Sequence, residues 1–246
     1  ADEAWPFANI FQLNAGLQLS ANKNIWIDAG VLPSHLGFES AISKSCWTLT
    51  RSLAAENSPY YETGIRLSGM SRKKKIKYGL LLLNGWQNIS VLPSENNIAL
   101  GTQLTYQPFA NIEISWNTYS GYDETIAADL FRTFHNFYLV FTPRGKFSFT
   151  AGFDLGFQQQ YRFPEKYSRW YSPQFLVRYQ LVQKLHLALR FENFTDKEAV
   201  ILRSVEGNGL AVNGISGNID LEPNRYLLIR VEARHLSATK DAFYQK

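Results

Sequence analysis

The sequence predicts an all-β fold, an antiparallel β-barrel that spans a membrane. Three observations lead to this prediction: long segments of alternating apolar and polar residues, an aromatic content of 15%, and connections that alternate between short and long. Successive side chains of a strand point to opposite faces, so such segments give a sheet with one apolar wall and one polar wall. Lipid on one side and water on the other is the setting in which long, repeated alternation is typical.

The clearest alternation lies at residues 146–157. One face carries Phe147, Phe149, Ala151, Phe153, Leu155 and Phe157, and the other carries Lys146, Ser148, Thr150, Gly152, Asp154 and Gly156. The same pattern recurs at residues 10–19, 111–117, 184–192 and 227–234, and the charged residues of the last three segments fall with the polar set. This sorting favours a hydrated interior, because a charge in a packed core is costly unless it is paired.

Twelve strands are predicted between clusters of Pro, Gly, Asn and charged residues. No helix of ordinary length and no low-complexity linker interrupts them, so residues 1–246 are predicted to form a single outer-membrane β-barrel domain. In chain order the predicted strands are 8–19, 23–31, 61–70, 75–84, 97–107, 111–120, 130–142, 146–157, 170–180, 184–193, 208–216 and 224–235.

The connections between these strands alternate in length. Short turns are predicted at 21–23, 71–74, 108–110, 143–145 and 181–183, with one of intermediate length at 217–223, and long loops at 32–60, 85–96, 121–129, 158–169 and 194–207. Outer-membrane barrels have short turns on the periplasmic rim and long loops outside. The first and last predicted strands would then both have their free ends outside. Closed barrels normally keep both ends in the periplasm, so we expect an odd number of further strands at each end and about 14 to 16 strands in the complete barrel.

Composition argues against several other classes of protein. The chain has no run of about 18 apolar residues, which excludes a transmembrane helix. No signal peptide stands at the start, so the chain is expected to be either mature or cytosolic. The single Cys46 cannot form an internal disulfide, and the four histidines lack the spacing of metal ligands. No Gly-rich phosphate loop appears. We therefore predict no catalytic residue, metal or cofactor, and no enzyme.

One basic run remains to be explained. Residues 72–75 read Arg-Lys-Lys-Lys, which is a pattern that can bind nucleic acid or anionic lipid. A solvated turn between two strands is the simpler interpretation. No nucleic-acid partner is predicted.

The segment 32–60 is too long for a connector, and long loops without regular structure are usually functional. Residues 42, 46, 49 and 53 have helical spacing, whereas residues 47, 49, 51 and 53 alternate as in a strand, and both interpretations stay open. We predict that the segment folds into the lumen and narrows it, with Glu39 and Arg51 paired with wall charges. The alternative is a surface loop outside the barrel.

The polar sets of the strands supply the other candidate site residues. The predicted lumen and constriction residues are Glu39, Arg51, Glu62, Arg66, Glu113, Asp154, Arg178, Arg190, Glu192, Arg230, Glu232 and Arg234, with Asp28 and Lys77 on the same wall. Rings of charge in pores tune ion preference. Both signs occur on neighbouring strands, however, so mutual neutralisation is as good an interpretation as selectivity, and no ion preference is predicted.

Several segments resemble a known family. They are Asp28-Ala29-Gly30, Gly37-Phe38-Glu39-Ser40, Thr50-Arg51-Ser52-Leu53, Pro59 to Gly64 and Asn84-Gly85-Trp86, with Phe191 to Lys197 and Arg230 to Arg234 towards the C-terminus. Their order and spacing are similar to those of the putative β-barrel porin family, the OmpL-like outer-membrane proteins. Members usually have further strands before the segment that resembles residues 8–31 and a final strand after residues 224–235. The resemblance implies the bacterial outer membrane and a pore or transport role, without a known substrate.

These observations together predict a porin-like channel for passive diffusion of small hydrophilic solutes. The expected partners are outer-membrane lipid and lipopolysaccharide, the solutes themselves, and other outer-membrane proteins. The alternative function is that of a structural barrel subunit in a multi-protein outer-membrane complex, with a plugged lumen. A soluble lipocalin-like binder does not fit the strand number, and it would put its apolar face inward.

Overall fold

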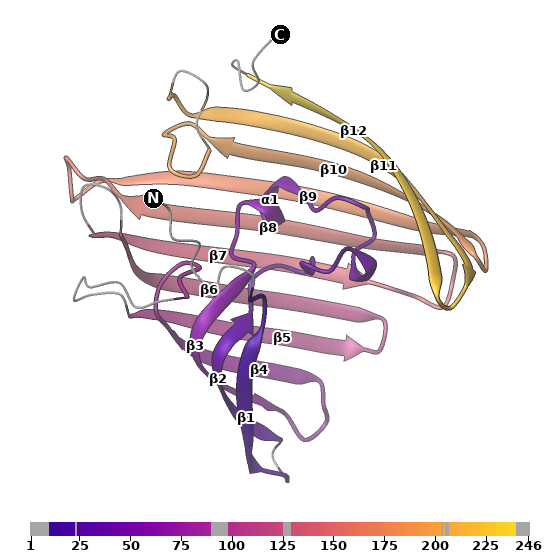
Figure 1. Cartoon of the computed structure of the whole chain (residues 1–246), viewed down its shortest axis with the longest axis horizontal. Helices are drawn as coiled ribbons and strands as arrows, with labels where there is room; N and C mark the ends of the chain where they lie inside the picture. The colour runs from indigo at the N-terminus through magenta and orange to yellow at the C-terminus, as the bar shows by residue number, and fades with distance from the viewer. Residues whose placement is uncertain are drawn as a thin grey trace.

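The computed structural model describes residues 10–22, 24–89, 98–124, 129–202, 204 and 207–239. Almost all regular structure in these ranges belongs to one antiparallel sheet in which each strand pairs with its neighbours in the chain (Figure 1). The strands are β1 (Leu13–Ser20), β2 (Ile25–Pro33), β3 (Tyr61–Met70), β4 (Ile76–Leu83), β5 (Ala99–Phe109), β6 (Ile112–Glu124), β7 (Asp129–Phe141), β8 (Phe147–Gln159), β9 (Tyr167–Val182), β10 (Leu185–Asp196), β11 (Leu210–Asn224) and β12 (Leu227–Ala238).

The twelve predicted strands are all present, and short and long connections alternate as predicted, with some shifts of boundary, except between β6 and β7, where one strand ends at Glu124 and the next begins at Asp129. The turn predicted at 217–223 is wrong, because β11 continues to Asn224. Its Gly, Asn and Pro suggested a turn, yet Asn218 and Asp220 are buried residues of the strand whose side chains hydrogen-bond to each other at 2.6 Å. The loop predicted at 121–129 is mostly strand, and its centre at 125–128 lies outside the described residues, as do residues 8 and 9 of the first predicted strand.

The sheet curls without closing, and β1 and β12 are its two edges. Its convex face exposes apolar side chains from successive strands, among them Trp116, Phe153, Leu189 and Ile229. The opposite face, which we call the polar face, carries the charged wall residues. The antiparallel register places Asp28 beside Arg66 and Asp220 beside Arg230, which shows that partners on neighbouring strands share this face. The sorting inferred from the sequence thus holds along most of each strand.

The polar face becomes apolar where the strands meet the long loops. Leu81, Leu83, Tyr119, Phe134 and Trp170 point to this face and pack in one buried cluster. Leu36 joins it, with residues 200–202 from the loop between β10 and β11 partly buried against it. The interior that the sequence predicts to be hydrated is therefore apolar at this rim. Side chains from the loops provide the cover that lets these large groups leave water.

Residues 34–60 leave β2, cross the polar face and return to β3; we call them the inner segment. Figure 1 shows this segment in front of β7 to β9. It contains a 3-10 turn at Ser43–Ser45 and one turn of α-helix, α1, at Leu53–Glu56, and is otherwise irregular. Neither interpretation of its periodicity, helix or strand, describes it. None of the helices in the described residues is long and apolar enough to cross a membrane.

Candidate functional site

The inner segment is fixed at its start by His35, which is buried. Its Nδ1 lies 2.7 Å from Glu62 Oε2 and its Nε2 lies 2.8 Å from the backbone oxygen of Thr118. Both partners are acceptors, so the imidazolium, which donates from both nitrogens, fits this position best. Burial by itself lowers the pKa of His35, but the Glu62 carboxylate outweighs it and the pKa is raised. The ring also needs Gly101, where a Cβ would lie 2.9 Å from its Cε1.

The next contacts of the inner segment are with β7 and β8. The backbone N–H of Gly37 donates to Asn136 Oδ1 at 3.0 Å. The ring of Phe38 meets that of Tyr138 edge to face, with centroids 5.8 Å apart. It occupies space left by Gly152, because a Cβ there would lie 2.9 Å from the ring. Glycine on the polar face therefore provides a seat for the segment.

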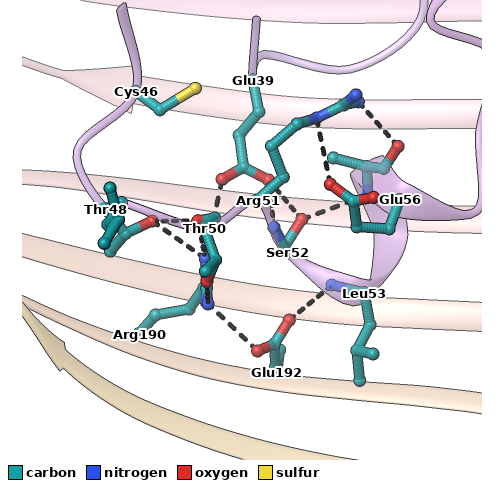
Figure 2. A network of polar contacts seen from close by, with 12 residues as sticks. Glu39, Cys46, Thr48, Thr50, Arg51, Ser52, Leu53, Glu56, Arg190 and Glu192 are labelled. Carbon is teal, nitrogen blue, oxygen red and sulfur yellow. Dashed lines mark hydrogen bonds and ion pairs between the residues drawn. The ribbon is translucent and has the colours of Figure 1, made fainter. Parts of the chain in front are cut away.

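The far part of the inner segment is held by Arg190 of β10, which is fully buried. Its Nη1 donates to the backbone oxygen of Thr50 at 2.7 Å and to Thr48 Oγ1 at 2.9 Å (Figure 2). Its Nη2 donates to Glu232 Oε1 at 2.9 Å. An irregular segment leaves backbone groups without partners, which is costly when they are buried. The Arg190 guanidinium, with five donors, satisfies the Thr50 backbone oxygen and the hydroxyls of Thr48 and Thr50 at once.

Arg230 of β12 makes a second attachment of the same kind. Its Nη2 donates to the backbone oxygen of Cys46 at 2.6 Å, and its Nη1 donates to the backbone oxygens of Ser43 and Thr48. The Asp220 carboxylate lies 2.9 Å from its Nε, so the charge is compensated. Two arginines thus hold one stretch of backbone, residues 43–50, against β10 to β12.

Carboxylates of the wall accept hydrogen bonds from backbone N–H groups of the inner segment. Glu232 Oε2 accepts from the Thr50 backbone at 2.7 Å, and Glu192 Oε2 accepts from the Leu53 backbone at 2.6 Å. Glu192 reaches Arg234, and Glu232 reaches Arg190, across β11, which carries the small residues Gly214 and Ser216 at this level. At Gly214, a Cβ would lie 2.7 Å from Glu192 Cγ. Charges of both signs therefore form one frame around the segment.

Glu39 connects the two limbs of the inner segment. Its Oε2 accepts from the Ser52 backbone at 3.0 Å and from the Ser52 hydroxyl, while Ser52 Oγ in turn accepts from Ala55 N at 3.2 Å and so caps α1 (Figure 2). Its Oε1 is 3.9 Å from Arg190 Nη1. Burial raises the pKa of Glu39, against the opposing effects of the Ser52 hydrogen bonds and of Arg190. The expected proximity of Glu39 to a wall charge is thus observed.

Arg51 corrects the other half of that expectation. Its Nη2 donates to the backbone oxygen of Ala55 at 2.6 Å, its Nε is 3.9 Å from Glu56 Oε1, and its guanidinium lies 4.0 Å from the centre of the Tyr60 ring. These partners all belong to the inner segment, and no wall carboxylate within the described ranges forms an ion pair with it. The helical turn of α1 brings Ala55 and Glu56 nearer to Arg51 than the wall is.

Other wall charges are left uncovered. Arg66 pairs with Asp28 at 3.1 Å, and Lys77 lies 3.8 Å from Glu113. Arg178 is 3.5 Å from Asp220 and 3.6 Å from Glu222, at a cavity of about 320 Å³ that opens between residues 44–47 and the ends of β9, β11 and β12. Except for Asp220, which is buried, these side chains are open to water, and they lie on the half of the sheet nearer the short turns.

The remaining predicted residues are drawn into buried contacts. Asp154 accepts a hydrogen bond from Asn136 Nδ2 at 2.6 Å, and Glu62 accepts hydrogen bonds from the backbone and the ring of His35. Arg234 reaches Glu192 at 2.8 Å. Four residues of the site were not among those predicted, namely His35, Asn136, Asn218 and Asp220. Asn136 stands in the polar set of its strand, and Asn218 and Asp220 fell in the turn wrongly predicted at 217–223. His35 gave no such signal, because its partners come from β3 and β6.

The site has the chemistry of a polar passage more than that of a reaction centre. No group of His, Cys, Asp and Glu side chains in the described ranges is arranged to hold a metal ion. Cys46 is buried and its Sγ donates to the backbone oxygen of Ser40, while burial raises the pKa of the thiol. A protonated, buried thiol is a poor nucleophile.

Comparison with known proteins agrees with this geometry. A family model described as putative beta-barrel porin-2, OmpL-like, matches residues 3–246. Among solved structures, the chain is similar to the outer membrane channel DcaP of Acinetobacter baumannii, with 12% identity, 87% of this chain and 67% of that chain covered, and a TM-score of 0.60. It is also similar to a loop L8 deletion mutant of OmpT, an outer membrane protein of Vibrio cholerae, with 8% identity, coverages of 89% and 72%, and a TM-score of 0.58. No curated protein matches the sequence significantly.

Proposed function

This chain belongs to the putative beta-barrel porin-2, OmpL-like family, and we propose that the inner segment forms the constriction of its channel. The protein is a porin-type β-barrel of the bacterial outer membrane, through which small hydrophilic solutes diffuse passively. The polar face is its lumen wall. The observation that carries the proposal is the attachment of residues 43–50 to Arg190 and Arg230, which keeps irregular backbone over the wall. Such backbone is tolerated at membrane depth only where protein buries it or where it lines a water-filled cavity.

The solute path then follows the uncovered part of the wall. The charged side chains that meet the solute are Asp28, Arg66, Lys77, Glu113 and Arg178. The ion pairs of Glu192 with Arg190 and Arg234 act as a frame. Discrimination is by size and by local charge, because both signs line the passage. The work needs neither a covalent step nor a cofactor, so the protein is not an enzyme.

Shortening the inner segment tests this proposal. Replacing residues 41–50 by a short Gly-Ser linker removes the backbone that Arg190 and Arg230 hold, so we expect single-channel conductance in planar bilayers to rise at least about twofold. A matched control shortens the loop at 161–166, on the same rim, and should leave conductance unchanged. Equal conductance of the wild type and the 41–50 variant would refute a constriction at this segment.

A second function is favoured by one observation, the apolar cluster around Tyr119, Phe134 and Trp170 that fills the polar face beside the long loops. A barrel plugged there would serve as a structural subunit of an outer-membrane assembly. It would show no conductance before or after the 41–50 replacement, and it would purify with fixed partners. Measurable conductance of the purified wild type decides for the channel.

A further inference from the structure

All charged residues of the described short turns are cations. The turn between β3 and β4 carries Arg72, Lys73, Lys74 and Lys75, and the turn between β7 and β8 carries Arg144 and Lys146. Lys184 follows β9 and Arg225 follows β11. We call these eight residues the basic rim. All are exposed, and none lies within ion-pair distance of a carboxylate in the part of the chain that is described.

The opposite rim shows that this is no general property of the connections. The long loops mix signs: Glu39 and Glu56 accompany Lys44 and Arg51 in the inner segment, and Glu165 stands next to Lys166. One rim of the sheet is therefore uniformly positive, whereas the other is nearly balanced. A field of one sign over a whole rim attracts a surface of the opposite sign.

The conformation of one turn is a second, independent observation. Lys74 has a φ of +55°, a left-handed conformation that glycine or asparagine adopts with less strain. Hydrogen bonds fix it there, since Lys74 N donates to Ser71 O at 2.8 Å and Ser71 N donates to Ile76 O at 2.8 Å. A lysine at a position where the backbone favours glycine points to a use for its charge.

The same turn borders a recess. A hollow of about 290 Å³ lies between it and the turn after β1, lined by Asn22, Asn24, Ser71, Arg72 and Lys74 among others. Amide, hydroxyl and cationic donors around one hollow are the groups that bind a phosphate ester. Anionic oxygens, more than a neutral headgroup, suit this lining.

The depth of the basic rim identifies the occupant. Tyr78, Tyr106 and Tyr226 lie on or near these short turns and are 43%, 44% and 80% exposed. Exposed tyrosines of this kind mark the level where hydrocarbon gives way to headgroups. Cations just beyond that level are at the height of lipid phosphates, and short turns face the periplasm in this class of barrel.

We propose that the basic rim binds anionic phospholipid headgroups of the periplasmic leaflet, with the recess beside Lys74 as one seat. Each cation in contact with a headgroup strengthens binding by about fivefold at moderate ionic strength. The contacts anchor the rim and fix the depth of the barrel in the membrane. Lipid binding by the basic rim depends on the membrane orientation of the family and does not depend on the constriction. Failure of one proposal would therefore leave the other intact.

The test measures which phospholipids the purified full chain retains. The protein is incubated with equimolar phosphatidylglycerol and phosphatidylcholine in mixed micelles, washed, and its bound lipid is quantified by mass spectrometry. We expect phosphatidylglycerol to exceed phosphatidylcholine at least about fivefold, and the excess to shrink as salt is raised. Changing Arg72, Lys73, Lys74 and Lys75 to Gln should bring the ratio towards one, whereas Arg162→Gln with Lys166→Gln, on the long-loop rim, should leave it unchanged.

A single substitution separates loss of lipid binding from misfolding. Lys74→Gly removes one charge while it relieves the left-handed backbone, so it should fold at least as well as the wild type and retain less phosphatidylglycerol. Equal retention of the two lipids by the wild type, or unchanged selectivity in the Gln variant and in Lys74→Gly, would overturn the proposal. A Gln variant that alters the anion preference of the channel without altering lipid retention would also overturn it, because the rim would then act on solutes.

Discussion

Two arginine–carboxylate pairs on the polar face have nearly the same geometry and different surroundings. Arg66 and Asp28, on β3 and β2, lie 3.1 Å apart with side chains 27% and 17% exposed. Arg190 and Glu232, on β10 and β12, lie 2.9 Å apart with side chains 0% and 2% exposed. The sequence pattern that supplies them is the same alternation in both regions. What differs is that the inner segment covers the second pair and leaves the first open.

Burial under the inner segment changes the contribution of an ion pair to stability. An exposed ion pair contributes little to stability, because water stabilises each separate charge almost as well as the partner charge does. A buried pair must be complete, because removal of one partner leaves an uncompensated charge in a poor solvent. The covered region is therefore a frame that fixes the constriction, and the uncovered region is the one that interacts with whatever passes.

The largest expected effect comes from truncating the covered pair. Arg190→Ala leaves Glu192, Glu232 and the Thr50 carbonyl without their shared donor, so we expect the free energy of unfolding to fall by about 3–5 kcal/mol. Denaturant titration of the barrel in micelles measures this, and Arg66→Ala is the matched truncation at the uncovered pair, with a loss of at most about 1 kcal/mol. Similar losses in the two variants would mean that cover by the inner segment has no energetic consequence.

A smaller effect is expected where the inner segment rests on a glycine. Gly152→Ala places a methyl group 2.9 Å from the Phe38 ring, so the ring must move or the segment must lift. We expect destabilisation by about 1–3 kcal/mol and raised conductance. Gly79→Ala is the control on the same face, since its nearest neighbour would be 3.5 Å away, and it should change stability by less than about 1 kcal/mol. Equal stability and equal conductance of the two variants would mean that the Phe38 ring does not rest on Gly152.

The contrast between the regions explains how far the sequence could be interpreted. Alternation gives the strands and the wall to which Arg66 and Arg190 both belong, because side-chain direction in a strand is a local property. Cover is not local: Arg190 meets Thr50 across 140 positions of sequence, and His35 meets Thr118 across 83. Pairing within the inner segment likewise depended on the turn of α1, so Arg51 was assigned the wrong partner. Leu81 and Leu83 stand in a run of four leucines that has no alternation to interpret.

A pH-dependent effect is expected at His35, where the cover begins. The pKa of His35 is raised above its ordinary 6.5, so its contribution to stability is fully present below pH 6.5 and is lost as pH rises through the higher, folded value. The neutral ring keeps its proton on Nδ1, facing the Glu62 carboxylate. Nε2 then turns a lone pair towards the Thr118 backbone oxygen, at a cost of about 2 kcal/mol, while the positive charge of Arg66 nearby favours the deprotonation. Conductance should rise as pH is raised above 6.5, and His35→Gln should remove that rise. Persistence of the full rise in His35→Gln, or its loss in the control His186→Gln, would contradict this assignment.

The smallest effect on stability, and the most direct test of the uncovered region, is expected from Arg66→Gln. The pair with Asp28 is partly solvated, so stability should change by at most about 1 kcal/mol. The carboxylate of Asp28 then stands unpaired beside the passage, and the local potential becomes more negative. The reversal potential in a KCl gradient should therefore shift towards cation preference, whereas Arg66→Lys, which keeps the charge, should shift it much less. Arg190→Gln gives the complementary measurement, since a covered charge should alter stability far more than ion preference. A reversal potential that responds to Arg190 and not to Arg66 would place the ions on the side of the inner segment that is now assigned to the frame.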